Sequence, residues 1–268
     1  MCQQFCGTDA VHSSLRYLDR RGLLKGAAAG AAVMALSACE TPNAETGRNQ
    51  VILVDEAQLQ QASLQAWTEI RREKPEWRNA AAQRRLETVG RRVVQAAGRG
   101  NQNWEFVLFD SAEKNAFVLP GGQVGFFRGL YEISERDDWI ATVLGHETGH
   151  VTGRHAAERY SRDLIAQQAG AAVGAITNSN IATAAFGIGV QGFVALPFSR
   201  QQELEADTLG LRYMHAAGYD PRQAIPFWQR MEQGGGARPP EFISTHPDPD
   251  NRIQRIRDYI NAQGWGPV

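Results

Sequence analysis

The stretch that decides the fold lies in the middle of the chain, at residues 137–160, and reads DDWIATVLGHETGHVTGRHAAERY. Its apolar residues recur at the spacing of a buried helix face. Ser134, just upstream, is a candidate N-cap, and Asp137 and Asp138 would lie in a first turn that favours negative charge. The pattern predicts one helix that begins after Ser134 and runs to about Tyr160.

This predicted helix carries the pattern H-E-x-x-H at residues 146–150. His146 and His150 are four residues apart and therefore lie one above the other on one face of the helix. Two imidazoles in this arrangement can hold one zinc ion. Glu147 lies about 100° round the helix from His146, close enough to act as the general base on a zinc-bound water.

A catalytic zinc ion needs a third protein ligand, and the sequence offers two continuations. The metzincin pattern H-E-x-x-H-x-x-G-x-x-H finds its glycine at Gly153, but position 156 is Ala and the available histidine, His155, comes one residue early. On a continuous helix His155 would lie off the metal-binding face. We therefore expect it to be a surface residue or to support a ligand from outside.

The other continuation is a later predicted helix, residues 201–217, at whose start Glu203 and Asp207 share a face. One of the two can bind the metal while the other accepts the free ring N–H of a ligating histidine. Glu205 faces elsewhere, towards solvent or an arginine.

Together, H-E-x-x-H and S-R-x-x-E-x-E-A-D resemble the gluzincin metallopeptidases, which include the CAAX prenyl protease and the HtpX-type and Oma1-like proteases. The resemblance is closest to the short, periplasmic, lipid-anchored Oma1-like branch. It implies one Zn²⁺ per chain, bound by His146, His150 and Glu203. It also implies that Glu147 is the catalytic base and that Asp207 supports a ligand.

The resemblance extends to two segments outside these helices, and Arg252 matches as well. Asn115, Ala116 and Phe117 lie in a predicted strand that is either ordinary sheet or a strand that binds extended substrate by β-augmentation. The loop motif S-T-H-P contains His246, which we expect within reach of the metal. There it would either displace the catalytic water and keep the enzyme latent, or stabilise the developing oxyanion; the alternative is an exposed loop histidine.

The N-terminus has the pattern of an export signal. A basic stretch precedes residues 26–38, which carry no charge and are too short to span a bilayer as a mature helix. The stretch R-R-G-L-L-K resembles a twin-arginine signal. L-S-A-C, ending at Cys39, resembles a bacterial lipobox, which implies that Cys39 is lipidated, and Glu40 favours the outer membrane. We divide the chain into a signal peptide (1–38), a lipidated polar tether (39–50) and one metallopeptidase domain (51–268).

The composition excludes several classes of protein. With 43% hydrophobic and 21% charged residues among 268, the chain is globular. Its 28 basic and 29 acidic residues are mixed, which argues against nucleic-acid binding. The three cysteines are Cys2, Cys6 and Cys39, so a cysteine zinc finger and a cysteine nucleophile are both excluded.

The remaining periodicities predict an α+β fold, a mostly helical zincin-like domain with a small β-sheet. Residues 164–199 contain no charge, and we expect two buried helices, or a helix and a loop, rather than a membrane hairpin. The other expected elements are strands at 51–54, 104–109, 116–119 and 123–127 and helices at 55–74, 79–97, 221–232 and 250–262.

The resemblance, together with the export signal, implies a zinc metalloendopeptidase that hydrolyses unfolded or misassembled cell-envelope proteins. Its expected partners are those substrates and the membrane that holds the lipid on Cys39. A chaperone-like zinc protein and a peptidase for cell-wall peptides are the alternatives. An intact Glu147 argues against the first, since a structural zinc site needs no base. The sequence leaves the natural substrate and the oligomeric state open.

Overall fold

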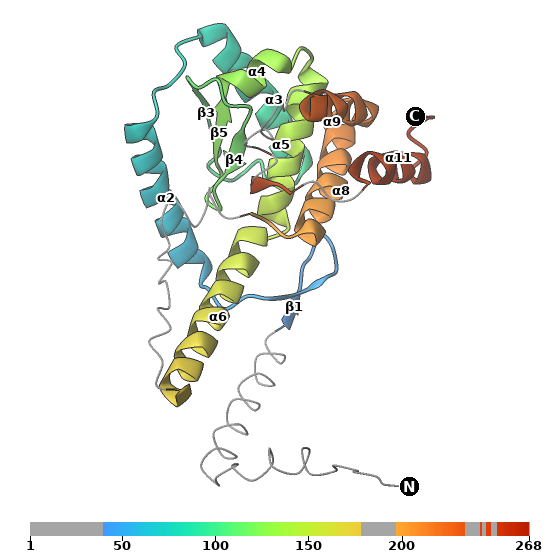
Figure 1. Cartoon of the computed structure of the whole chain (residues 1–268). Coiled ribbons are helices and arrows are strands. Elements are labelled where there is room, and N and C mark those ends of the chain that lie inside the picture. Colours follow the sequence, from blue (N-terminus) through green and yellow to red (C-terminus); the bar gives the residue numbers. More distant parts are fainter. Residues whose placement is uncertain (1–39, 178–196, 234–241, 243–244, 248–250, 268) are drawn as a thin grey trace, which may run out of the picture.

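The computed structural model describes residues 40–177, 197–233, 242, 245–247 and 251–267, so the expected signal peptide and Cys39 lie outside the described residues. The fold is α+β and mostly helical, as predicted (Figure 1). Its elements are β1 (Glu40–Pro42), β2 (Asn49–Val51), α2 (Glu56–Glu73), α3 (Ala80–Ala96), β3 (Glu105–Phe109), β4 (Ala116–Val118), β5 (Gln123–Phe127), α4 (Arg128–Ile133), α5 (Asp137–Thr152), α6 (His155–Thr177), α8 (Arg200–Ala216), η1 (Pro221–Gln223), α9 (Ala224–Gln233) and α11 (Arg252–Ala262).

A three-stranded sheet lies between two layers of helices. Its strand order is β3-β5-β4, with β3 parallel and β4 antiparallel to the central β5. Alternate residues point to opposite faces: Val124 and Phe126 belong to the core around α3 and α5, whereas Phe117 and Phe127 pack with α2. Figure 1 shows α2 on one side of the sheet and α3 and α5 on the other. The strand β4 is left at one edge of the sheet.

The helices α5 and α8 pack against each other with their backbones in close approach. A Cβ atom on Gly149 would lie 2.8 Å from the carbonyl oxygen of Ala206, and one on Gly145 would lie 2.9 Å from that of Gly210. Only glycine fits these two positions of α5 without moving the helices apart. The short spacing brings the first turns of α8 beside the last turns of α5, which carry the H-E-x-x-H motif (Figure 1).

The predicted single helix over residues 137–160 is wrong, because the chain breaks at Gly153 and Arg154. Arg154 has φ 54°, a left-handed conformation that ends α5, and α6 begins at His155. A Cβ on Gly153 would lie 2.4 Å from the His155 Nε2 atom. The break thus turns His155 back against the end of α5.

The start of α5 also differs from the prediction. Ser134 ends an additional short helix, α4, and its hydroxyl donates to the Leu130 carbonyl at 2.8 Å. The residue at the N-cap of α5 is Arg136, which makes no side-chain capping bond. Asp137 and Asp138 do lie in the first turn, as expected.

Residues 40–51, which we call the N-terminal hairpin, are packed onto the domain although the composition predicted a polar tether there. The Asn43 amide donates to the Thr152 carbonyl at 3.1 Å, and the Gln50 amide donates to the Gly153 carbonyl at 2.7 Å. These carbonyls belong to the end of α5, where the helix leaves its last acceptors unpaired. The strand predicted at residues 51–54 lies earlier in the structure, where β2 spans Asn49–Val51 and its Gln50 side chain is buried.

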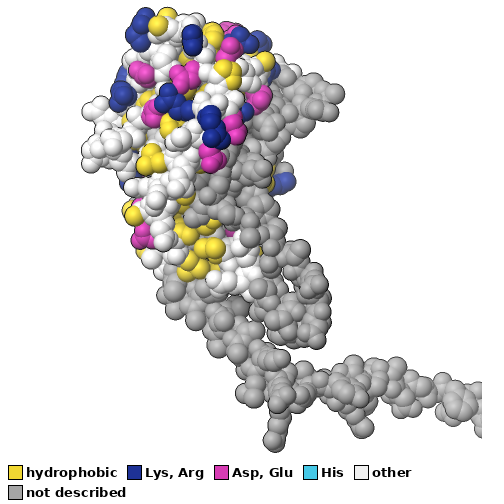
Figure 2. Space-filling view, turned by 90° about the vertical axis from the view of Figure 1, so that its left-hand side faces the viewer, with side chains coloured by type: hydrophobic (Ala, Val, Ile, Leu, Met, Phe, Trp, Pro, Cys, Tyr) yellow, Lys and Arg dark blue, Asp and Glu magenta, His cyan; other side chains and the backbone are white. Residues whose placement is uncertain are grey.

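The charge-free segment lies only partly within the described chain. Residues 164–177 continue α6, and residues 178–196 lie outside the described residues. Among the residues that the structure describes, no helix combines the length and the hydropathy needed to cross a membrane. On the α2 side of the molecule, basic and acidic side chains are interspersed over the upper part (Figure 2).

Candidate metal centre

Three segments of the fold bring five ionisable side chains into one buried group. The helix α5 supplies His146, Glu147 and His150 from its last turns. Glu203 comes from the first turn of α8, and His246 comes from the segment that precedes α11. All five side chains are buried, although each is polar. Burial of so many ionisable groups is costly unless they bind one another or a cation.

Four of these residues form a compact donor set: His146, His150, Glu203 and His246. The His146 Nε2 atom lies 3.1 Å from His150 Nε2 and 3.2 Å from His246 Nδ1. The Glu203 carboxylate reaches His146 at 3.3 Å, His150 at 3.4 Å and His246 at 3.1 Å. The predicted third residue, Glu203, therefore lies beside both histidines of α5.

This donor set fits a zinc ion. Ligands held ~2.1 Å from a tetrahedral metal lie ~3.4 Å from one another, close to the separations found here. The ring nitrogens of His146 and His150 face each other, an arrangement that a shared cation stabilises. The Glu147 Oε1 atom is buried and has no hydrogen-bond partner among the described residues. A carboxylate oxygen that makes no hydrogen bond to these residues suits a group that handles the proton of a water molecule.

The outer nitrogen of His146 is held by Asp207, the second acidic residue predicted on α8. The His146 Nδ1 atom lies 2.8 Å from Asp207 Oδ1. Arg252 donates from Nε to Asp207 Oδ2 and from Nη2 to Glu203 Oε2, both at 2.9 Å. The planar guanidinium thus fixes both carboxylates of α8 against the same histidine.

The outer nitrogen of His150 is held by His155. The two Nδ1 atoms lie 2.9 Å apart, and His155 Nε2 lies 3.0 Å from Glu205 Oε2. The surface position considered for His155 is therefore wrong, since its side chain is fully buried. The helix break after Gly153 accounts for this position. Glu205 contacts Arg48, which is the arginine contact that the sequence allowed.

The charges of the group shift its protonation. Burial by itself would lower the pKa of His146, but the Glu203 charge and the bond to Asp207 outweigh it and raise that pKa to about 9. Burial raises the pKa of Glu147. Burial would also raise the pKa of Glu203, but the charges of His246 and His146 outweigh it and hold that pKa well below the usual value. The site therefore favours a positive charge between these side chains, and Glu147 has the raised basicity of a general base.

His246 is placed by stacking on Phe242, whose ring centroid is 4.2 Å away. Its backbone N–H donates to the Phe242 carbonyl at 2.8 Å, and its Nε2 atom lies 3.5 Å from Glu147 Oε1. His246 thus contacts His146 and Glu203 through Nδ1 and the general base, Glu147, through Nε2. His150 stacks in the same way on Phe198, at 3.9 Å.

The predicted substrate strand borders this group. The backbone N–H of Val118, in the edge strand β4, donates to Glu147. Ala116 and Phe117 lie in β4, and Asn115 directly precedes it; all three side chains are buried. One edge of β4 pairs with β5, and the other edge lies towards Glu147 of α5.

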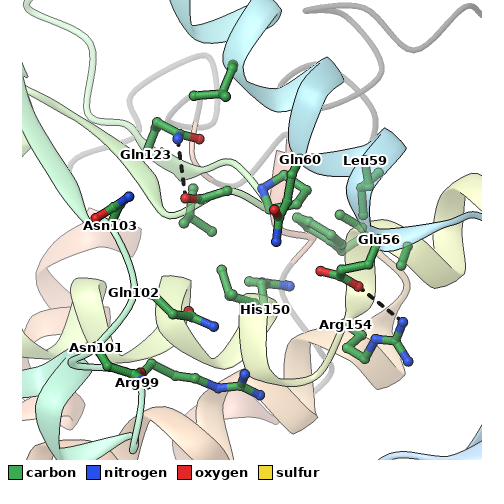
Figure 3. Close-up of a pocket in the computed structure, with 18 residues that line it drawn as sticks. Glu56, Leu59, Gln60, Arg99, Asn101, Gln102, Asn103, Gln123, His150 and Arg154 are labelled. Atoms are coloured by element: carbon green, nitrogen blue, oxygen red, sulfur yellow. Dashed lines mark hydrogen bonds and ion pairs between the residues drawn. The ribbon is translucent and has the colours of Figure 1, made fainter.

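A cleft of about 530 Å³ opens beside the strand and the metal group. Figure 3 shows His150 at its base, with Gln60 of α2 above and Gln102 beside it. Glu56 and Arg154 pair across one side at 3.2 Å. The wall combines apolar and carboxamide side chains from distant parts of the chain.

Sequence reasoning missed several contacts of the site. It identified Arg252 only as a motif match, and it assigned no role to Arg48, Phe198 or Phe242. Nothing in the local pattern marks these residues, because their partners lie up to 157 residues away along the chain. The H-E-x-x-H motif and the Glu203–Asp207 pair were visible because each lies within one turn of one helix.

Comparisons with known proteins agree with this geometry. The profile of peptidase family M48 matches residues 80–260. The mitochondrial metalloendopeptidase OMA1 of Saccharomyces cerevisiae is 35% identical over 193 residues, which cover 66% of this chain and 55% of that protein. OMA1 of Schizosaccharomyces pombe is 34% identical over 64% of this chain and 51% of its own length. The beta-barrel assembly-enhancing protease of Escherichia coli is 31% identical over 66% of this chain and 38% of its own. The chain thus spans about half the length of these relatives, or less.

Proposed function

The chain belongs to peptidase family M48, and from that premise we propose that it is a zinc metalloendopeptidase acting on unfolded or misassembled proteins of the bacterial cell envelope. The observation that carries the proposal is the buried group of four metal donors beside Glu147, whose Oε1 atom makes no hydrogen bond among the described residues and lies 3.5 Å from His246 Nε2. A purely structural metal site has no use for such a base.

In this mechanism His146, His150 and Glu203 would hold the zinc ion. When bound, zinc supplies Lewis-acid chemistry for hydrolysis of an amide. Glu147 takes a proton from the attacking water at its Oε1 atom and later passes it to the leaving amine.

The edge strand β4 supports a preference for unfolded substrates. The edge of β4 that does not pair with β5 lies beside Glu147, so an extended peptide paired along this edge would cross the catalytic group. Such pairing depends on backbone hydrogen bonds more than on side chains. A segment whose backbone is already hydrogen-bonded in a folded protein cannot form these bonds. The relative in Escherichia coli is named for β-barrel assembly, which fits a role in the envelope.

We further propose that the protein is exported and held at the outer membrane by lipid on Cys39. The support is the L-S-A-C motif after a charge-free stretch, together with Glu40 as the following residue. The hairpin that begins at Glu40 would then place the catalytic domain close to the lipid surface.

Turnover of casein by the wild type and by Glu147→Gln tests the proposed activity. The variant should keep the metal and lose about 10²–10⁴-fold in kcat, the usual value of general-base catalysis. Glu56→Gln is the matched control, because Glu56 lines the same cleft on its exposed side. Near-normal turnover by metal-loaded Glu147→Gln would refute the mechanism.

Envelope proteomics with the inactive Glu147→Gln chain as a trap tests the substrate class. Unfolded or misassembled envelope proteins should accumulate on the variant and be shortened by the wild type. Equal capture without cleavage by both proteins would favour the chaperone-like alternative. Cleavage of cell-wall fragments, with casein left intact, would favour the peptidase of cell-wall peptides.

A further inference from the structure

A chain of buried polar groups runs from the N-terminal hairpin to the metal ligand His150. The His150 Nδ1 atom lies 2.9 Å from His155 Nδ1, and His155 Nε2 lies 3.0 Å from Glu205 Oε2. The other oxygen of Glu205 accepts a hydrogen bond from Nε of Arg48, which belongs to the hairpin. Segments far apart in sequence are thereby connected, from residue 48 to residue 205.

The hydrogen bonds of this chain have one consistent direction. His150 presents Nε2 to the metal donors, so its proton sits on Nδ1 and is donated to His155. His155 must then accept at Nδ1, and it carries its own proton on Nε2, which donates to Glu205. The opposite tautomer of His155 would set two N–H groups against each other. The carboxylate of Glu205 therefore selects the tautomer of His155, and His155 selects that of His150.

Arg48 is fixed firmly enough to hold Glu205 in place. Its Nη1 and Nη2 atoms donate to the two oxygens of Glu158 at 2.7 and 2.6 Å. Glu158 is buried at 2% exposure and also accepts from Gln50 at 3.2 Å. The three guanidinium nitrogens thus donate to two carboxylates, those of Glu158 and Glu205, an arrangement that Lys cannot reproduce.

We propose that Arg48 is a positioning residue of the metal centre: through Glu205 and His155 it fixes the ring orientation and tautomer of His150, so that the N-terminal hairpin completes the metal site. His146 has the corresponding support in Asp207 and Arg252, from α8 and α11. The inference goes beyond the proposed function, because metal affinity can be measured whatever the natural substrate is.

The test is the affinity of the full-length chain for Zn²⁺, measured by competition with a chromophoric chelator. Arg48→Gln should raise the Kd for Zn²⁺ about 10–100-fold, the usual effect of losing an outer support of a ligand. The visible spectrum of the Co²⁺-loaded protein should change as well, because a reoriented His150 ring changes the ligand field at the metal. Arg71→Gln is the matched control, since Arg71 also bridges two carboxylates, Glu76 and Glu105, at the C-terminal end of α2.

A double-mutant cycle with His155→Ala separates positioning from general stability. If Arg48 acts through His155, Arg48→Gln should add little to the Kd in the His155→Ala background. Equal effects in both backgrounds, or a folded Arg48→Gln protein with wild-type Kd and Co²⁺ spectrum, would overturn the proposal. Should Arg48→Gln fail to fold by circular dichroism, the near-isosteric Glu205→Gln takes its place, with the same expected loss and the same cycle.

Discussion

At the scale of single residues, each histidine of the H-E-x-x-H motif uses both ring nitrogens. His146 donates outwards to Asp207 directly, whereas His150 reaches a carboxylate only through the ring of His155. The two inner nitrogens therefore point at one place, and Glu203 joins them there. A ligand whose tautomer is fixed in advance loses less freedom when the metal binds.

The first prediction concerns the donors themselves. His146→Ala, His150→Ala and Glu203→Ala should each abolish tight Zn²⁺ binding, because each variant keeps only two of the three residues proposed to hold the metal. His155→Ala should retain Zn²⁺ with weaker affinity, since it removes a support and not a ligand. Metal content after dialysis against a chelator measures both. Complete metal loss in His155→Ala would revive the metzincin-like reading, in which His155 is itself a ligand.

The second prediction concerns His246, which we propose keeps the enzyme latent. Its Nδ1 atom lies 3.2 Å from His146 Nε2 and 3.1 Å from Glu203, within the donor set itself. A ligand there competes with water for the metal, so His246→Ala should raise basal casein hydrolysis. A lower kcat without metal loss would instead identify an oxyanion donor, and unchanged activity and Kd would leave His246 without a role.

At the scale of elements, the contact between α5 and α8 sets the distance from the histidines to Glu203. Gly149→Ala should force the helices apart, because its Cβ would lie 2.8 Å from the Ala206 carbonyl oxygen. We expect a loss of about 1–3 kcal/mol in unfolding free energy, the usual result of overpacking, and weaker Zn²⁺ binding.

Chemical denaturation and chelator competition measure the two effects of Gly149→Ala. Gly90→Ala is the matched control: its Cβ would lie 2.4 Å from the Phe106 ring, so that it overpacks α3 within the hydrophobic core and not at the metal donors. It should lower stability and leave the Kd for Zn²⁺ unchanged. Equal losses of affinity in both variants would mean that the α5–α8 spacing has no special role.

The contact of α6 with the N-terminal hairpin should be visible as a pH dependence of stability. Burial would raise the pKa of Glu158, but its hydrogen bonds to Arg48 and Gln202 outweigh this and lower the pKa from 4.5 to about 2. A carboxylate with a lowered pKa stabilises the fold above its unfolded pKa, and this contribution disappears as the pH falls through the folded pKa. The loss should therefore occur between pH ~4.5 and ~2.

Urea denaturation of the wild type and of Glu158→Gln at a series of pH values measures this contribution. The variant should be less stable at pH 7 and should lose less stability on acidification. Glu56→Gln, which removes an exposed ion pair with Arg154, should follow the wild type. Parallel curves for wild type and Glu158→Gln would contradict the assignment.

At the scale of the whole molecule, the lipid that we propose on Cys39 would be attached directly before the hairpin that packs on the catalytic domain. Cys39→Ser should abolish fatty-acid labelling and move the protein from the membrane fraction to the soluble fraction. Catalysis on casein should be retained, because the hairpin itself is unchanged. If Cys39→Ser stays with membranes through salt and alkaline washing, the charge-free residues 164–199 would have to be the anchor.

The sequence by itself determined the features that depend on neighbours along the chain. The H-E-x-x-H helix, the shared face of Glu203 and Asp207 and the paired strands β4 and β5 follow from periods of 3.6 and 2 residues. The α+β class follows from the same periods. Motifs of this kind carry their geometry within one or two turns, so that no knowledge of the rest of the molecule is needed.

Only the tertiary structure decided which distant groups complete the site. At the break after Gly153, Asn43 and Gln50 bind the carbonyls at the end of α5, and the break turns His155 onto His150. The tertiary structure likewise decided the positions of Arg48 and Arg252 and the stacking of His246 on Phe242. Each depends on the packing of segments far apart in sequence, where burial makes an unpaired polar group costly and long-range contacts outweigh the local preference of the chain.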